Sequence, residues 1–198
     1  MGRTSTARER LVDAACDLMH ARGYAALGVA EICATADVRK GSFYHFFDSK
    51  QALTVAAIET SWTRQRPVWT AALAADVAPL DRIRRVLESQ VDTQRAEKKS
   101  LGVLRGCLFG NLAQELGNQD DLVAGHLTAV FDDQITLVSE ALAAAEAEDA
   151  IPAGTGTQET ARAVLAQLEG MVLFAKLAND PALLDRLWPN TMLLLGAR

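Results

Sequence analysis

The chain has 198 residues, of which 49% are hydrophobic and 23% are charged, and its formal net charge at pH 7 is −5. This much apolar sequence is enough for a buried core, and Cys16, Cys33 and Cys107 are odd in number without a Cys-x-x-Cys pair, which argues against a disulfide framework or a zinc site. No cationic start leads into an apolar run and no stretch reaches about 18 apolar residues, so we expect neither signal peptide nor membrane span, and a cytoplasmic protein.

The spacing of apolar residues predicts an all-α fold of about nine helices. Alanine, leucine, glutamate and arginine recur at intervals of three to four residues, and β-branched runs are short. In chain order, the expected helices cover about residues 6–22, 29–35, 39–47, 50–75, 79–100, 101–116, 122–148, 158–179 and 181–195. Gly23 is the expected stop of the first helix, Asp48 or Ser49 caps the fourth, and Pro67 disturbs it.

Residues 29–50 carry the most informative pattern: two short helices around a tight turn at Ala36-Asp37-Val38. Apolar side chains here have the spacing of one packed face, which would hold the two helices at the wide angle of a helix-turn-helix. These side chains are Ile32, Val38, Phe43, Phe46 and Phe47. The opposite face combines cations, hydroxyls and an imidazole with a small glycine: Arg39, Lys40, Gly41, Ser42, Tyr44 and His45. Such a face suits the base edges and phosphates of double-stranded DNA.

The distribution of charge agrees with this interpretation, although the acidic total alone argues against a nucleic-acid partner. Residues 1–50 hold seven Lys or Arg against six Asp or Glu, whereas residues 51–198 hold 13 against 19. An acidic body would keep the rest of the chain away from phosphates while a locally basic face approaches them. Lys50 is poorly placed in the first turn of its helix for the helix dipole, a cost that disappears if that helix start faces a phosphate.

The run from Ala36 to Leu53 resembles the DNA-binding signature of TetR/AcrR-type repressors, and the similarity is strong over roughly residues 6–55. The resemblance implies a helix-turn-helix domain over residues 1–50 and an effector-sensing and dimerisation domain over 51–198. It also implies that Arg39, Lys40 and Ser42 approach bases or phosphates and that Tyr44, His45 and Lys50 hold the DNA backbone. Asp37 departs from the glycine usual in the family, but aspartate tolerates left-handed backbone angles, so the turn should survive.

The rest of the chain shows no nucleotide loop, metal-ligand spacing or catalytic triad, and we expect neither a cofactor nor an enzyme. The resemblance implies that this body binds a small-molecule effector and forms a homodimer through its last two helices. Apolar side chains there exceed what two terminal helices need internally, which predicts a subunit contact. The residues expected in it are Leu165, Leu168, Met171, Val172, Leu184, Leu187 and Trp188.

Residues 105–115 mix glycines and polar groups into an apolar stretch that is expected to be helical. The Gly106-Cys107-Leu108 run, together with Ala175-Lys176-Leu177, resembles the electrophile- and oxidant-responsive branch of the family, in which the cysteine is the sensing thiol. A lysine near Cys107 would favour its thiolate. A cysteine among apolar residues is otherwise a small buried hydrophobe, and the effector would then bind reversibly in a pocket lined by Trp62, Phe109, Asn111, Gln114, Phe131 and Phe174.

Two other classes of protein stay open at this point. An enzyme or ligand carrier without DNA affinity would need a convergent polar cluster, for which the interior candidates are Glu115, Asp132, Asp133 and Lys176. A purely structural helical dimer is the other possibility. The sequence favours a DNA-binding repressor that an effector releases from its operator.

Overall fold

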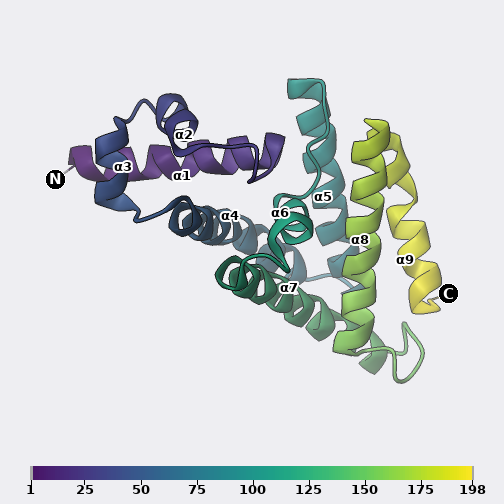
Figure 1. The fold of residues 1–198 in the computed structure, drawn as a ribbon. Helices are drawn as coiled ribbons and strands as arrows, with labels where there is room; N and C mark the ends of the chain where they lie inside the picture. The colour runs from purple at the N-terminus through teal and green to yellow at the C-terminus, as the bar shows by residue number, and fades with distance from the viewer. Residues whose placement is uncertain (1, 198) are drawn as a thin grey trace. The chain divides into compact units, whose positions relative to one another are not determined.

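The computed structural model describes residues 2–197, and the side chains of residues 7–197. Every regular element in this range is a helix, which confirms the predicted all-α class (Figure 1). The helices are α1 (Gly2–Arg22), α2 (Val29–Thr35), α3 (Lys40–Phe46), α4 (Lys50–Leu73), α5 (Pro79–Leu101), α6 (Leu108–Leu116), α7 (Asp121–Ala147), α8 (Gln158–Ala178), the 3-10 helix η1 (Pro181–Arg186) and α9 (Leu187–Leu195). No helix among these described residues is long and apolar enough to cross a membrane.

The chain divides into two compact units. The first unit contains the residues up to Arg64 together with Leu108–Val130, and the second contains Gln65–Cys107 together with the residues from Phe131 onward. The division therefore differs from the predicted domain boundary after residue 50, because α6 and the starts of α4 and α7 belong to the first unit.

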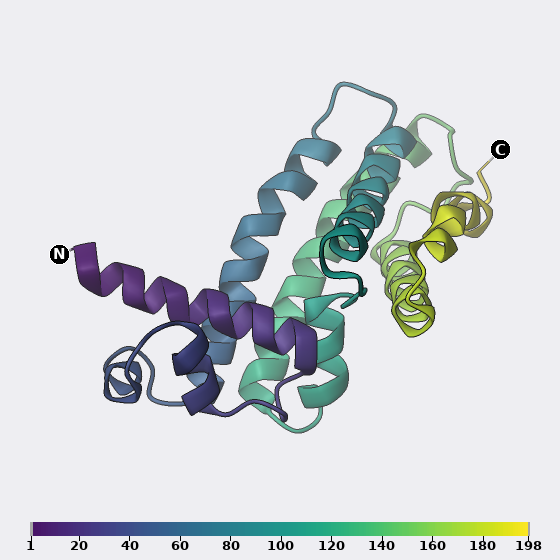
Figure 2. The same cartoon turned by 90° about the horizontal axis from the view of Figure 1, so that it is seen from above.

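In the first unit, α1 packs against both α2 and α3, and α6 lies at the carboxyl end of α1 (Figure 2). The buried face of α1 meets apolar side chains of α2, α3 and α4. The fully buried residues of this core include Leu11, Ala15, Met19, Ile32, Phe43, Leu53 and Ile58. Because the short α2 and α3 cannot form a core of their own, the long α1 supplies the surface that fixes them.

In the second unit, α8 packs against η1 and α9, and η1 and α9 also contact α5. Helix α8 begins at Gln158 as predicted, and Thr157 caps it, because its hydroxyl oxygen accepts the N–H of Thr160 at 3.1 Å. The last helix begins differently from the prediction: Asp180 accepts the N–H of Ala182, and one 3-10 segment precedes α9. Buried apolar side chains of α5, α8, η1 and α9 form a core between these helices: Ile83, Val86, Leu87, Leu168, Val172, Leu184, Leu187 and Leu195.

The predicted helix over residues 101–116 is wrong in its first half. Residues 102–107 are not helical, and both Gly102 and Gly106 have left-handed backbone angles, with φ of 75° and 82°. The backbone N–H of Leu104 is bound by the side chain of Asn179 at 3.0 Å, and that of Arg105 by Glu97 at 2.7 Å. These side chains satisfy the groups that a helix would have paired, so α6 begins only at Leu108.

Candidate nucleic-acid interface

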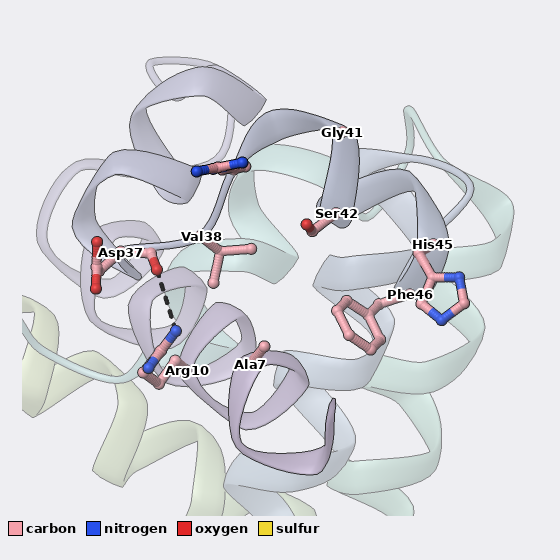
Figure 3. A pocket seen from close by; sticks show the side chains of 9 residues that line it. Ala7, Arg10, Asp37, Val38, Gly41, Ser42, His45 and Phe46 are labelled. Atoms are coloured by element: carbon pink, nitrogen blue, oxygen red, sulfur yellow. Dashed lines mark hydrogen bonds between the residues drawn. The ribbon is translucent and has the colours of Figure 1, made fainter. Parts of the chain in front are cut away.

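The turn between α2 and α3 is built as the sequence predicts. Asp37 adopts a left-handed conformation with φ of 50°, and the N–H of Val38 donates to the carbonyl oxygen of Cys33 at 2.9 Å. Arg10 of α1 holds this turn from outside, because its guanidinium donates to the carbonyl oxygen of Asp37 at 3.0 Å (Figure 3). The sequence pattern gave no sign of this contact, which joins residues 27 positions apart.

The predicted packed face is formed, with Ile32, Phe43 and Phe47 buried. The rings of Phe43 and Phe47 lie 5.9 Å apart between centroids. The other two predicted members, Val38 and Phe46, are only half-buried and line a hollow of about 500 Å³ between α1, the turn and α3 (Figure 3). The hollow also receives cationic and polar groups from both helices: Arg10, Arg39, Ser42 and His45.

The predicted DNA-facing residues of α3 are on its solvent side. All of them are exposed: Arg39, Lys40, Gly41, Ser42, Tyr44 and His45. Tyr44 exposes 54% of its surface although its ring touches the edge of Phe43, with centroids 5.1 Å apart. Helix α3 therefore presents hydroxyl, imidazole and cationic groups on one side and buries aromatic carbon on the other.

Lys50 lies differently from its neighbours on this surface. Its ammonium donates to the carbonyl oxygens of Tyr24 and Leu27, at 3.0 and 2.8 Å, and lies 3.7 Å from the centroid of the Tyr24 ring. Burial lowers the pKa of Lys50, and the nearby Glu115 carboxylate opposes that shift. The structure thus gives a second reason for a lysine at this helix start, one that needs no phosphate.

The contacts of Glu115 were not predicted from the sequence, in which this residue stood out only as an interior candidate of an enzyme. Its two carboxylate oxygens accept the backbone N–H groups of Tyr24 and Ala25, at 2.7 and 2.6 Å. After α6, Asp120 accepts the side-chain amide of Gln51 at 2.8 Å. The partners are 91, 90 and 69 positions apart in the chain, so no local pattern could have revealed them.

The second unit contains the candidate thiol, Cys107, which is half-buried at the end of the segment before α6. Gln94 donates to the carbonyl oxygen of Gly106 at 3.2 Å, and Glu97 pairs with the Arg105 guanidinium at 2.6 Å. The side chain of Glu169 on α8 is hydrogen-bonded to Cys107, and burial raises the pKa of this carboxyl while the thiol contact opposes the rise. Lys176, the predicted partner, is half-buried seven residues further along α8.

The other residues predicted to bind an effector have different environments. In the first unit, Trp62 and Phe109 are buried with ring centroids 6.4 Å apart, Asn111 is half-buried and Gln114 is exposed. In the second unit, Phe131 is half-buried, whereas Phe174 exposes 63% of its surface. No group of three or more His, Cys, Asp or Glu in the described part of the chain is arranged to hold a metal ion.

The residues predicted at the subunit contact are mostly covered by their own chain. Leu165, Leu168, Val172, Leu184 and Leu187 are buried, and Met171 and Trp188 are half-buried, because α5 packs against η1 and α9. These buried side chains are core residues of the second unit. Other large apolar side chains of α8, η1 and α9 are exposed: Leu173, Phe174, Leu177, Leu183, Leu193 and Leu194.

This fold and site define a class: a helical protein with an amino-terminal helix-turn-helix for DNA. Residues 11–57 match the family described as "Bacterial regulatory proteins, tetR family", and residues 79–190 match "Tetracyclin repressor-like, C-terminal domain". The chain belongs to the TetR family of bacterial transcriptional regulators.

The chain is similar to individual members of this family over most of its length. It is 34% identical to the transcriptional regulator AcuR of Cereibacter sphaeroides, over 89% of this chain and 80% of AcuR. A solved TetR regulatory protein from Rhodobacter sphaeroides has a TM-score of 0.84 at 29% identity, covering 93% of this chain and 96% of that one. The reduced form of NemR, an Escherichia coli transcriptional repressor, has a TM-score of 0.82 at 25% identity, covering 97% and 99%.

Proposed function

We propose that the chain represses transcription by binding operator DNA as a homodimer in the cytoplasm, without catalytic activity, and that an effector acting on its second unit releases it. One observation supports the proposed DNA binding: α3 buries Phe43 and exposes its polar and cationic side. In this proposal the side chains that read bases or neutralise phosphates are Arg39, Lys40 and Ser42. Gly41 permits close approach, and Tyr44, His45 and Lys50 hold the DNA backbone.

The test of DNA binding is selection of bound sequences from a random pool, followed by affinity measurements at several salt concentrations. Arg39→Ala and Ser42→Ala should change the selected sequence, and each lost base contact should cost about 5- to 150-fold in affinity for the original operator. Tyr44→Ala should weaken binding to all sequences alike. Arg85→Ala, at an exposed position of α5, is the matched control. Selection of the same sequence with unchanged affinity by all three variants would refute the proposal.

For the effector, we propose that Cys107 is the sensing thiol and that an electrophile adds to it. The half-buried position of the thiol and the resemblance of the Gly106-Cys107-Leu108 run support this choice. The competing hypothesis is a ligand that binds reversibly to the residues expected to line a pocket. The experiment below distinguishes it from alkylation of Cys107.

N-ethylmaleimide is the probe for this half of the proposal, since it alkylates thiols without an oxidant. It should release operator DNA from the wild-type chain and not from Cys107→Ser. Cys16→Ser is the matched control, because burial raises the pKa of the Cys16 thiol, whose sulfur lies 3.3 Å from the Ser61 hydroxyl. Release of both Cys107→Ser and wild type would exclude Cys107 as the sensing residue.

For dimerisation, we propose that the exposed apolar side chains of α8 and α9 form the subunit contact. Leu177 and Leu193 expose 80% and 77% of their surface, far more than side chains of this size expose in a core. A two-fold contact would place two recognition helices about 34 Å apart on one face of DNA, so that each reads one half-site.

A further inference from the structure

The connection between α1 and α2, residues 23–28, is held from both sides by two charged side chains of the first unit. Glu115 of α6 accepts the N–H groups of Tyr24 and Ala25, at 2.7 and 2.6 Å. Lys50 of α4 donates to the carbonyl oxygens of Tyr24 and Leu27, at 3.0 and 2.8 Å. In this non-helical connection, the carboxylate of Glu115 thus binds backbone N–H groups and the ammonium of Lys50 binds backbone carbonyl oxygens.

The carboxylate contact is specific in its geometry. Oε2 of Glu115 faces the N–H of Tyr24 and Oε1 faces that of Ala25, so both oxygens are used and the orientation of the carboxylate is fixed. Gly23 makes this approach possible, because a Cβ at that position would lie 2.8 Å from Oε2. Gly23 also has a φ of 81°, which turns the chain sharply after α1 and points the following amides at α6.

These contacts join two segments of the first unit that are about ninety residues apart in the chain. The connection leads directly into α2, which carries the turn and α3 behind it. Helix α6 is only nine residues long; it begins at Leu108, immediately after Cys107, and Glu115 lies one residue before its end. A displacement of α6 by about 1 Å would stretch both charge-assisted hydrogen bonds beyond useful length.

We infer that Glu115 is the residue through which α6 positions the helix-turn-helix. While its carboxylate binds the amides of Tyr24 and Ala25, α2 and α3 keep the geometry that reads the operator. When an effector displaces α6, the amides are released and the connection relaxes. This second step rests on the proposed function, whereas the first concerns operator binding alone.

The experiment compares Glu115→Gln and Glu115→Ala with wild type. The control is Glu148→Gln, which removes the same charge at an exposed position just after α7. Three quantities are measured: affinity for an operator selected by the wild-type chain, affinity for random DNA, and hydrogen exchange at the amides of Tyr24 and Ala25. We expect both Glu115 variants to lose at least tenfold in operator affinity, to bind random DNA like the control, and to exchange these two amides faster.

The response to N-ethylmaleimide gives a further readout, which a purely structural role would not change. The ratio of operator affinities before and after alkylation should fall toward one in both Glu115 variants and stay at the wild-type value in Glu148→Gln. If Glu115→Ala exchanges the two amides freely yet binds operator like the control, the inference is wrong and the proposed function stands. If the wild-type chain selects no operator at all, the proposed function is wrong and the inference falls with it.

Discussion

The ammonium of Lys50 lies 3.7 Å from the centroid of the Tyr24 ring and donates to the carbonyl oxygen of the same residue. Lys50→Met removes this cation and leaves the carbonyls of Tyr24 and Leu27 without a charged donor. We expect the free energy of unfolding to fall by about 1–3 kcal/mol, measured by urea denaturation.

The same variant tests the proposed phosphate contact of Lys50. An ammonium has three N–H donors, and two of them donate to carbonyl oxygens inside the chain. One N–H therefore remains that can donate to a phosphate oxygen. The slope of log affinity against log salt should then decrease by about 0.9 in Lys50→Met and stay constant in Lys99→Met, an exposed control on α5. A loss of stability with an unchanged slope would show that Lys50 acts only within the protein.

Asp37 allows a test of the turn without touching its contacts. Because its φ is 50°, a side chain without a local hydrogen-bonding group destabilises the folded state at this position, whereas glycine adopts the left-handed conformation without that cost. Asp37→Ala should lower the free energy of unfolding by about 1 kcal/mol, and Asp37→Gly should be at least as stable as wild type. Both keep the carbonyl that accepts Arg10. Equal stability of the two variants in thermal unfolding would contradict this account.

Helix boundaries were predictable where the signal is local. Gly23 ends α1, Ser49 caps α4 by accepting the N–H of Ala52 at 3.0 Å, and Thr157 caps α8. Each of these signals acts within four residues of the helix end. The exposed polar side of α3 was predictable for the same reason, because alternation around a short helix shows which side chains share a face.

Features that depend on distant partners were not predictable. The segment over residues 102–107 looks helical in composition, and its non-helical path depends on hydrogen bonds from other parts of the chain, among them those of Asn179 and Glu97. Apolar spacing on α8 showed which face is apolar, but not that the chain's own η1 and α9 cover Leu168 and Val172. Glu115 carries no local mark of its role, because its partners precede it by about ninety residues.

Glu169 predicts a dependence of stability on pH. An exposed glutamate has a pKa of about 4.3, and burial raises the pKa of Glu169 in the folded chain. The folded state therefore holds a proton at pH values where the unfolded state has lost it, and the free energy of unfolding falls as pH rises through that interval.

Glu169→Gln removes this proton uptake. Above the folded-state pKa of Glu169, the variant should be more stable than the wild-type chain, and its stability should vary less as pH rises from about 4.3. Urea denaturation at several pH values measures both effects, with Glu148→Gln as the exposed control. Parallel pH curves for Glu169→Gln and wild type would show that the folded environment does not favour the protonated acid.

The proposed subunit contact predicts the oligomeric state of two charged variants. Each fully buried leucine contributes about 1.5–3 kcal/mol, and a two-fold contact counts every substitution twice. Leu177→Glu and Leu193→Glu should therefore each weaken self-association at least a hundredfold. Leu122→Glu, on α7 with 50% of its surface exposed, should not. Sedimentation over a range of concentrations measures this, and dimers of wild-type strength in both α8 and α9 variants would place the contact elsewhere.

Gly23 gives an independent perturbation of the contact that Glu115 makes. Gly23→Ala adds a Cβ at a position with φ of 81°, only 2.8 Å from Oε2 of Glu115, so both the backbone and the carboxylate must shift. The left-handed conformation alone costs about 1–2 kcal/mol, and we expect at least that loss in the free energy of unfolding. Gly125→Ala, inside α7 with open space around it, should instead stabilise the chain by about 0.5–1 kcal/mol.

Measurements of operator affinity distinguish two effects of Gly23→Ala: backbone strain at position 23 and loss of the Glu115 carboxylate contact. Because alanine at position 23 displaces Glu115 from the amides of Tyr24 and Ala25, Gly23→Ala should lose operator affinity like Glu115→Gln. The double variant should then lose little more than either single one, since both remove the same interaction. Additive losses in operator affinity would mean that Gly23 and Glu115 act on DNA binding through separate routes, and the coupling through α6 would have to be abandoned.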